Sequence, residues 1–269
     1  GRLLVSLSTF TRIPFAFNSS AILSATSMIS GSGFGLGTIL LPVFALFFPV
    51  EIAITLTAIV HFLNNLFKLV LLGKYANFKI IAAFGIPAIL FAFIGAYTLK
   101  HLTGLTPLFD YILFGKQFYI EPLKVVIGLL LIFFALLDII PKLKNLQFDS
   151  QYLPLGGVLS GYFGGLSGHQ GALRSAFLIR ANLTKEVFIA TGVVIACIID
   201  ISRLSVYAET IIEQKDLLNY SLVIAATIAA FFGAFFGNKL VKKVTIESLQ
   251  KFVAFLLIVF SVFFILGII

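Results

Sequence analysis

The chain has 269 residues, of which 60% are hydrophobic and only 11% are charged, and its mean hydropathy is +1.11. Because a soluble domain carries about 25% charged residues, this composition excludes an ordinary soluble globular protein and predicts an integral membrane protein. The net charge of +8 does not indicate a nucleic-acid partner, because the basic residues stand singly between apolar runs, as they do in membrane proteins that follow the positive-inside rule.

Apolar segments follow one another along the whole chain, and two of them are interrupted. A spanning helix needs roughly 20 apolar residues. Unbroken segments of this kind lie at 52–72, 80–99, 123–140, 187–208, 218–237 and 250–268. The two broken segments are 19–48, interrupted at Gly31–Gly37, and 152–182, interrupted at Gly164–Gly171. Each fragment of a broken segment has about 12 residues, or about 18 Å of helix, which reaches the bilayer midplane and little further.

The connections between these segments are short, except for one loop at 100–121. Within this loop, Asp110–Ile120 has two β-prone runs on either side of Phe114-Gly115-Lys116, which predicts a small hairpin. At the start of the chain, the apolar run Leu3–Leu7 is too short for the hydrophobic region of a signal peptide, so we expect no cleavable signal.

The two halves of the sequence resemble each other at an offset of 135 residues. Each half has a broken segment followed by three unbroken ones. The polar residues that coincide at this offset are Glu51 with Glu186, Asn65 with Asp200, and Lys68 with Arg203. We therefore expect an all-α polytopic membrane protein built from two four-segment repeats, residues 1–145 and 146–269.

The distribution of basic residues distinguishes between possible topologies. If both broken segments cross the membrane, the Lys and Arg residues outside it divide seven to nine between the two sides, and this division predicts no orientation of the protein. If both turn at the midplane and leave on the side they entered, the division is ten to six, and the side that carries Lys74, Lys142 and Lys239–Lys251 should be cytoplasmic. The repeats are then inverted, because each contains three crossings, and the 100–121 loop faces outward. A mixed topology, in which only the second broken segment is re-entrant, divides the charges twelve to four and stays open.

A glycine-rich break at the midplane is suited to binding an anion. It exposes backbone N–H groups at the positive end of the second half-helix, and in an inverted repeat two such ends converge on one central site. Arg174 falls in the first turn after the second break. The candidate substrate-binding residues are Gly33, Gly35, Gly37, Gly168, His169, Gln170, Gly171 and Arg174. The alternatives are that the glycines serve tight helix packing, that Arg174 extends to a lipid headgroup and that His169 is structural.

A second group of polar residues lies on the predicted helices 52–72 and 187–208. Asp200 and Arg203 are three residues apart, so they share a helix face and can form an ion pair. Charges at membrane depth are costly unless paired and are usually functional. The candidate gating or coupling residues are Asn65, Lys68, Asp200 and Arg203. The alternative is that both pairs only hold helices together.

Two stretches carry a resemblance to a known family. The stretch LSGYFGGLSGHQGALRSAFLIRANLTKEVFIATGVVIACIIDISRL resembles the second-half signature of the TauE/SafE family of sulfite exporters and sulfonate permeases. The stretch GSGFGLGTILLPVFALFFPVEIAITLTAIVHFLNN resembles its first-half signature, which is more degenerate. The resemblance implies two four-segment repeats and transport of small sulfur-containing anions such as sulfite, sulfoacetate or aryl sulfonates. It indicates the class of solute rather than the solute.

We therefore expect a multi-pass transporter of the cell membrane, with a small sulfur-containing anion and membrane lipid as partners; a homo-oligomer is compatible with the sequence. No spacing typical of metal ligands and no nucleotide-binding loop occurs, so we expect no cofactor and no enzyme activity. Since expulsion of a divalent anion from a negative cell interior needs no coupling ion, we expect export. An ion-coupled importer and a channel are the alternatives. A rhomboid-like intramembrane serine protease is a distant one, because Gly165-Leu166-Ser167-Gly168 fits its nucleophile motif but no histidine follows on a later helix.

Overall fold

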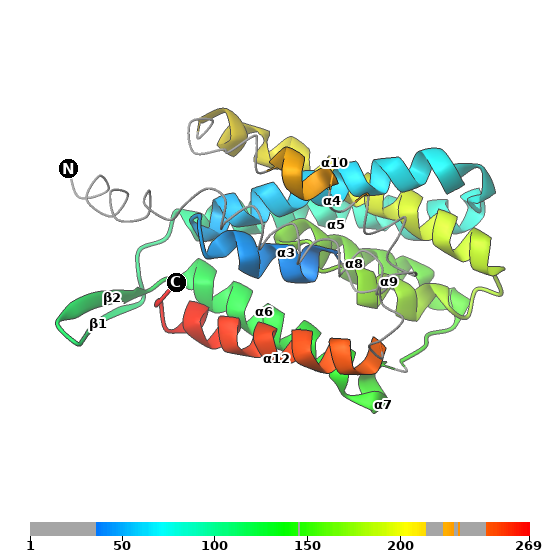
Figure 1. Cartoon of the computed structure of the whole chain (residues 1–269). Helices are drawn as coiled ribbons and strands as arrows, with labels where there is room; N and C mark the ends of the chain where they lie inside the picture. The colour runs from blue at the N-terminus through cyan, green and yellow to red at the C-terminus, as the bar shows by residue number, and fades with distance from the viewer. Residues whose placement is uncertain (1–35, 145, 214–222, 229–230, 232–245) are drawn as a thin grey trace.

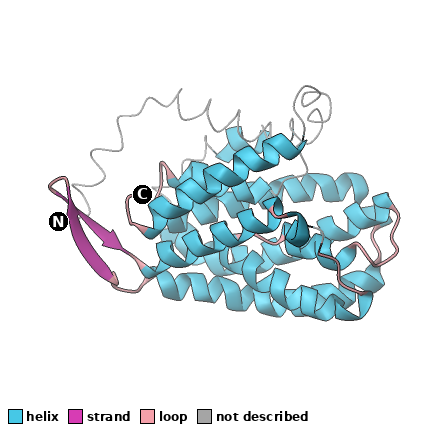
Figure 2. Ribbon diagram, turned by 90° about the horizontal axis from the view of Figure 1, so that it is seen from below, coloured by secondary structure: helices cyan, strands magenta, loops and turns pink. Residues whose placement is uncertain are grey.

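Long helices dominate the computed structural model, which describes residues 36–144, 146–213, 223–228, 231 and 246–269 (Figures 1 and 2). The principal helices are α3 (Leu36–Ala45), α4 (Val50–Leu72), α5 (Phe78–Thr103), α6 (Pro122–Ile139), α8 (Leu153–Ser167), α9 (Gly171–Leu178), α10 (Lys185–Glu213) and α12 (Ile246–Ile265). Short helical turns, Gly73–Tyr75, α7 (Pro141–Lys144) and Ser150–Tyr152, lie in the connections.

Four of the described helices are long and apolar enough to cross a membrane: Val50–Tyr75, Phe78–Thr103, Pro122–Ile139 and Lys185–Glu209. They correspond to the first four unbroken segments predicted from the sequence. The segment predicted at 250–268 overlaps α12, whose shorter apolar part is Lys251–Ile265. Most of the segment predicted at 218–237, and the first break with Gly33 and Gly35, lie outside the described residues. The all-α membrane class is confirmed at this level, and the two-repeat arrangement stays a prediction.

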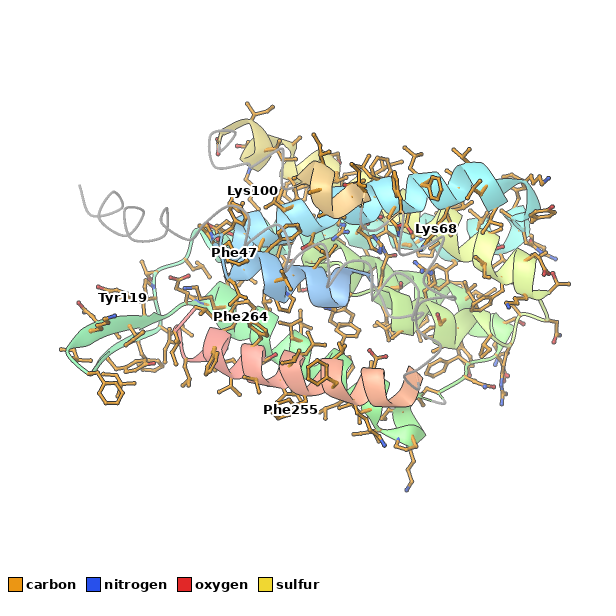
Figure 3. The ribbon with its side chains drawn as sticks, viewed as in Figure 1. Phe47, Lys68, Lys100, Tyr119, Phe255 and Phe264 are labelled. Atoms are coloured by element: carbon orange, nitrogen blue, oxygen red, sulfur yellow. The ribbon has the colours of Figure 1, made fainter. Side chains whose placement is uncertain are left out.

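The described helices run between two ends of the bundle. We call one the Asn77 end, where the short turn between α4 and α5 lies against α10 and the backbone N–H of Asn77 donates to Thr191 Oγ1 at 3.0 Å. We call the other the Lys100 end, where Lys100 on α5 forms an ion pair with Glu209 on α10. Helices α5 and α10 therefore run from the Asn77 end to the Lys100 end, while α4 runs the opposite way. Figure 3 labels Lys100, near the end of α5, and Lys68, near the end of α4.

Helices α5 and α8 are parallel and so close that only glycine fits between them. A Cβ on Gly157, Gly161 or Gly165 would lie 2.1, 2.4 or 2.1 Å from the carbonyl oxygen of Phe84, Ala88 or Ala92, respectively. These glycines repeat every four residues and face residues of α5 that also repeat every four. This is the small-xxx-small packing of membrane helices, and it confirms the packing alternative for these three glycines.

The hairpin predicted in the 100–121 loop is present at the Lys100 end. Strand β1 (Phe109–Leu113) pairs antiparallel with β2 (Lys116–Ile120), with Phe109 opposite Ile120. Phe114 and Gly115 both have positive φ at the tip, as a two-residue hairpin turn requires. The Tyr111 hydroxyl donates to the Leu266 carbonyl at 2.7 Å, which ties the hairpin to the end of α12 (Figure 1).

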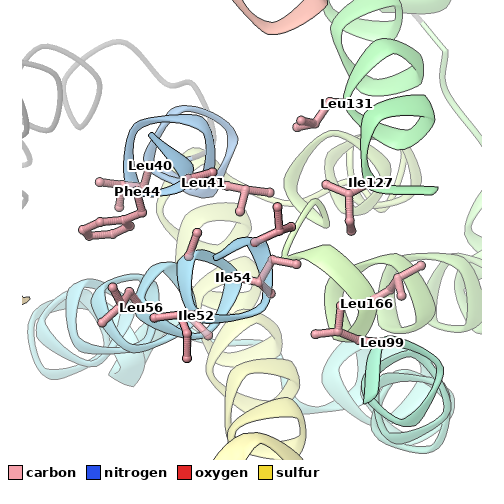
Figure 4. Close-up of a cluster of buried hydrophobic side chains, with 14 of the residues drawn as sticks. Leu40, Leu41, Phe44, Ile52, Ile54, Leu56, Leu99, Ile127, Leu131 and Leu166 are labelled. Carbon is pink, nitrogen blue, oxygen red and sulfur yellow. The ribbon is translucent and has the colours of Figure 1, made fainter. Parts of the chain in front are cut away.

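Among the described residues, the largest cluster of buried apolar side chains joins α3, α4, α6 and α12 to the Lys100-end halves of α5, α8 and α10. Figure 4 shows Leu40, Leu41 and Phe44 of α3 over Ile52, Ile54 and Leu56 of α4, with Leu99, Ile127 and Leu166 nearby. This core fixes α3 against α4 and holds the end of α8 in place. The segment that follows α8 therefore starts from a rigid point inside the bundle.

Candidate functional site

The second broken segment is interrupted at Gly168–Gln170, between α8 and α9. Gly168 has φ +83°, a left-handed conformation that favours glycine, and its N–H donates to the Gly164 carbonyl at 3.0 Å as the helix ends. The break is shorter than the Gly164–Gly171 run that the sequence predicted, because Gly164 and Gly165 remain helical. The turn is closed by the Gln170 N–H, which donates to the Gly168 carbonyl.

After the break, α9 returns toward the end of the bundle from which α8 came. Phe177 of α9 lies against Gly156, near the start of α8, and the Phe148 N–H donates to the Ala176 carbonyl. Just beyond α9, Arg180 pairs with Asp149 at 2.9 Å. Both ends of this broken segment therefore lie at the Asn77 end of the bundle.

Two polar side chains are buried in the break with hydrogen-bonding capacity to spare. His169 is stacked on Phe134 of α6 with ring centres 5.3 Å apart, and its Nδ1 lies 3.1 Å from Ser167 Oγ. Gln170 Oε1 accepts from Arg174 Nη1 at 3.2 Å. Among the described residues, His169 Nε2 and Gln170 Nε2 have no hydrogen-bond partner. Because a buried polar group without a partner is costly, these two atoms are candidates for contact with a polar ligand.

A partly open cavity of about 360 Å³ lies near the Asn77 end, between α4, α9 and α10. Its two charged lining residues are Lys68 and Arg174, both half-buried and both positive. The full lining is Asn65, Phe67, Lys68, Leu71, Leu72, Arg174, Ser175, Leu178, Phe188, Ile189, Gly192 and Val193. No carboxylate is among these lining residues, so the cavity attracts anions and its apolar walls strengthen that attraction by excluding water.

A buried polar cluster joins α4 to α10 beside the cavity; it consists of His61, Asn65, Asp200 and Arg203. Asp200 Oδ1 accepts from Arg203 Nε at 3.0 Å and from Nη2 at 2.7 Å. Asp200 Oδ2 accepts from Asn65 Nδ2 at 3.0 Å and lies 2.8 Å from His61 Nδ1. Asp200 and Arg203 are both 0% exposed. The predicted ion pair is thus present, and Asp200 has partners on both oxygens.

The structure brings the predicted residues into three neighbouring places. Gly168, His169, Gln170 and Gly171 form the break, Arg174 and Lys68 line the cavity, and Asn65, Asp200 and Arg203 belong to the polar cluster. Asn65 also lines the cavity, so it connects the last two. Gly37 lies in the first turn of α3.

Sequence reasoning did not give His61 a role in this cluster. It lies four residues before Asn65 and therefore on the same helix face, with its Nδ1 at 2.8 Å from Asp200 Oδ2. A histidine inside a spanning segment, one turn from a candidate residue, is the signal that could have identified it.

Ser167 and His169 do contact each other, although they occupy one turn and not two helices. Ser167 is 1% exposed, and its hydroxyl also lies 3.2 Å from the Phe163 carbonyl. Neither residue lines the cavity. A protease needs a substrate bond within reach of its serine, so the arrangement does not favour proteolysis.

Comparison with protein families identifies the chain. The sequence model described as "Sulfite exporter TauE/SafE" matches residues 20–264, nearly the whole chain. The comparisons with curated proteins and with solved structures gave no match.

Proposed function

Because the chain belongs to the TauE/SafE sulfite exporter family, it is a membrane transporter of the sulfite or sulfonate type, and we propose that it is a secondary transporter that exports small sulfur-containing anions. In this proposal the anion enters the cavity between α4, α9 and α10 and then reaches the break between α8 and α9. The observation that carries the proposal is the cavity, whose charged lining residues are Lys68 and Arg174, both cations.

Arg174 is the proposed first ligand of the anion. Its planar guanidinium matches the oxygens of a sulfite or sulfonate group better than the point charge of a lysine does. Its Nη1 already bonds Gln170 Oε1, and its Nε lies 3.4 Å from the Cβ position of Gly192, so the side chain is held over α10 at the cavity wall. Lys68 supplies a second positive charge opposite it.

The break is the proposed inner part of the path. Gly168 and Gly171 give the anion access to the backbone, and the N-terminus of α9 adds its positive end. The buried His169 Nε2 and Gln170 Nε2 have no partner among the described residues, which supports a polar occupant there. The polar cluster of Asn65, Asp200 and Arg203 would rearrange between the inward and outward states.

Two further observations support an inverted repeat with units 1–145 and 146–269. Asn65 and Asp200, which coincide at an offset of 135, are hydrogen-bonded to each other, as equivalent residues beside a twofold axis would be. Helices α3 and α9 begin at Leu36 and Gly171, and α4 and α10 begin at Val50 and Lys185, at the same offset. In this arrangement Gly33, Gly35 and Gly37 would supply the matching turn of the first unit.

The proposed orientation places the Asn77 end in the cytoplasm. That end carries Lys74, Lys79, Lys142, Arg180 and Lys185, whereas the Lys100 end carries, among the described residues, only the lysines Lys100, Lys116 and Lys124, together with Glu121, Glu209 and Glu213. In the cell membrane, which is the proposed location, the positive-inside rule then places the hairpin outside. The cavity would face the cytoplasm, where an exported anion is loaded.

The proposal is tested by binding and flux with purified protein. A panel of sulfite, sulfoacetate, taurine, benzenesulfonate, chloride and phosphate is screened for thermal stabilisation; a ligand at 100 times its Kd stabilises the folded protein by about 2.7 kcal/mol. We expect one of the sulfur oxyanions to stabilise the protein and to leave loaded proteoliposomes through it. If only chloride or phosphate does so, the substrate class is wrong, and if flux needs a proton or sodium gradient, the protein is the coupled importer.

A further inference from the structure

Arg203 has one donor edge that its ion pair does not use. Its Nε and Nη2 both donate to Asp200 Oδ1, whereas Nη1 has no hydrogen-bond partner among the described residues. The side chain is 0% exposed, so bulk water does not satisfy this group. A buried, unsatisfied guanidinium N–H is costly, and the ion pair with Asp200 gives no reason for it.

Asp200 is not free to satisfy Nη1. Its Oδ2 is occupied by Asn65 Nδ2 at 3.0 Å and by His61 Nδ1 at 2.8 Å, and its Oδ1 accepts two bonds from Arg203. These contacts hold the guanidinium in one orientation. The free edge therefore points in a direction set by α4 and α10 together, which is the preorganisation a binding group requires.

The free edge faces the break. Nη1 lies 2.5 Å from the position that a Cβ on Gly168 would occupy, so the absence of a side chain at Gly168 lets the guanidinium approach the turn. His169 and Gln170, which follow directly, are 4% and 1% exposed, and each also has an unpartnered side-chain nitrogen. Ser167 Oγ donates to the Phe163 carbonyl at 3.2 Å and lies 3.1 Å from His169 Nδ1, so His169 Nε2 is a donor only when this nitrogen carries the ring hydrogen or the ring is protonated.

We propose that Arg203 is a direct ligand of the transported anion at an inner subsite, which is formed by Arg203 Nη1, His169 Nε2 and Gln170 Nε2 and is separate from the cavity where Arg174 first binds it. The inference rests on the proposed transport function and makes it more specific. A head group with three oxygens, as in sulfite or a sulfonate, offers one acceptor to each of the donors Arg203 Nη1 and Gln170 Nε2, and a third to His169 Nε2 when this nitrogen carries the hydrogen. The bond from Arg174 Nη1 to Gln170 Oε1 links the cavity to this subsite.

Binding of an anion at this subsite also affects the polar cluster, because Arg203 belongs to both. An anion on Nη1 shares the guanidinium with Asp200, so its arrival changes the charge balance at Asp200, whose other oxygen contacts Asn65 and His61 of α4. Arg203 thereby acts as a ligand and as the group through which binding alters the contact between α4 and α10.

The decisive variant removes the charge of Arg203 without leaving Asp200 unpaired. In the Asp200→Asn/Arg203→Gln double variant both positions keep hydrogen-bonding side chains, and neutral replacement of a buried ion pair is often tolerated. The matched control is Asp149→Asn/Arg180→Gln, which neutralises the exposed pair with a 2.9 Å contact at the Asn77 end. Radiolabelled sulfite in oxygen-free buffer is the probe for binding and for flux.

We expect the double variant to fold and to bind sulfite about 10- to 100-fold more weakly than the unmodified protein, as the loss of a charged hydrogen bond implies, while the control binds normally. Wild-type affinity in the folded double variant would overturn the inference and leave Arg203 as a structural partner of Asp200. Failure of the unmodified protein to bind or move any sulfur oxyanion would instead refute the proposed function.

A measurement on the unmodified protein covers the case in which the double variant does not fold. The sequence has five arginines, so isotope-labelled arginine gives a countable set of guanidinium NMR signals. Single lysine substitutions at the other four positions assign Arg203 by elimination. We expect saturation with sulfite to move the Arg203 signal as well as that of Arg174; a shift of Arg174 alone overturns the inference and leaves the transport function standing.

Discussion

Replacing Gly165 by alanine tests whether the contact between α5 and α8 positions the break. The new Cβ would lie 2.1 Å from the Ala92 carbonyl oxygen and 2.8 Å from both the carbonyl carbon and the Cα of Ala92. Carbon–oxygen contacts between packed helices are normally about 3.3–3.6 Å, so the helices would have to separate locally by roughly 1.2 Å. All three opposing atoms belong to the backbone, so no side-chain rotation can relieve the clash.

The expected loss of stability follows from this geometry. Overpacking of a tight interface costs about 1–3 kcal/mol, and the better helix propensity of alanine returns up to about 1 kcal/mol. We therefore expect a net destabilisation of about 1–2 kcal/mol, a factor of about 5–30 in the folding equilibrium. Because Gly165 lies three residues before Gly168, the displacement also moves the break, so sulfite flux should fall as well.

The assay compares Gly165→Ala with Gly85→Ala in mixed micelles titrated with SDS. Gly85 is a matched control, because it also lies inside an apolar helix of the bundle but its Cβ would meet only ordinary contacts at 3.7 Å, with Ile198 and Ile81. We expect Gly85→Ala to be as stable as the unmodified protein or slightly more stable. Equal unfolding midpoints for the two variants would refute the proposed close contact of α5 and α8.

Three further predictions concern charge, orientation and driving force. Arg174→Ala should abolish sulfite flux in proteoliposomes without loss of expression, and Arg174→Lys should reduce it because a point charge does not replace the planar guanidinium; wild-type flux in Arg174→Ala would show that this side chain only contacts lipid headgroups. In a Cys197→Ser background, Asp110→Cys should react with an impermeant thiol reagent on intact cells and Lys142→Cys should not, and the reverse pattern would invert the proposed orientation. An anion of charge −2 gains about 4.6 kcal/mol on leaving a cell at 100 mV, which sustains a roughly 2000-fold gradient, so efflux from proteoliposomes should follow a clamped potential; efflux that follows only a pH or sodium gradient would contradict export driven by the potential.

The helices and the position of the second break were predictable because they depend on local features. Runs of apolar residues determined the spanning segments, and a dense glycine run marked the break. The boundaries were less accurate, because α5 begins with a cap at Asn77, whose side chain accepts from the Ile80 N–H at 3.2 Å, and ends at Thr103, beyond the apolar run. A segment delimited by hydropathy alone therefore ends before the helix does.

The role of each glycine and the surroundings of Lys68 depend on contacts between residues that are distant in the sequence. Gly164 and Gly165 belong to the run that predicted the break, yet both are helical, and a Cβ on Gly165 would meet Ala92 of α5, a contact that the local sequence does not reveal. Lys68 coincides with Arg203 in the repeat, but it faces the cavity with Arg174 and does not join the polar cluster. His61 was assigned no role because the approach of α10 to α4 cannot be derived from either helix alone.

The hydrogen bond between Asn65 and Asp200 has a consequence for the origin of the fold. In an antiparallel pair of identical half-length chains, a residue on the twofold axis meets its own copy. Two aspartates there would repel each other, and two asparagines would leave Arg203 without a counter-charge. One of each is possible only when the halves differ, so halves that arose by the proposed duplication must have diverged at this position. In the proposed inverted repeat, a hydrogen bond between an asparagine and an aspartate at equivalent positions is therefore one that a symmetric homodimer of identical halves could not form.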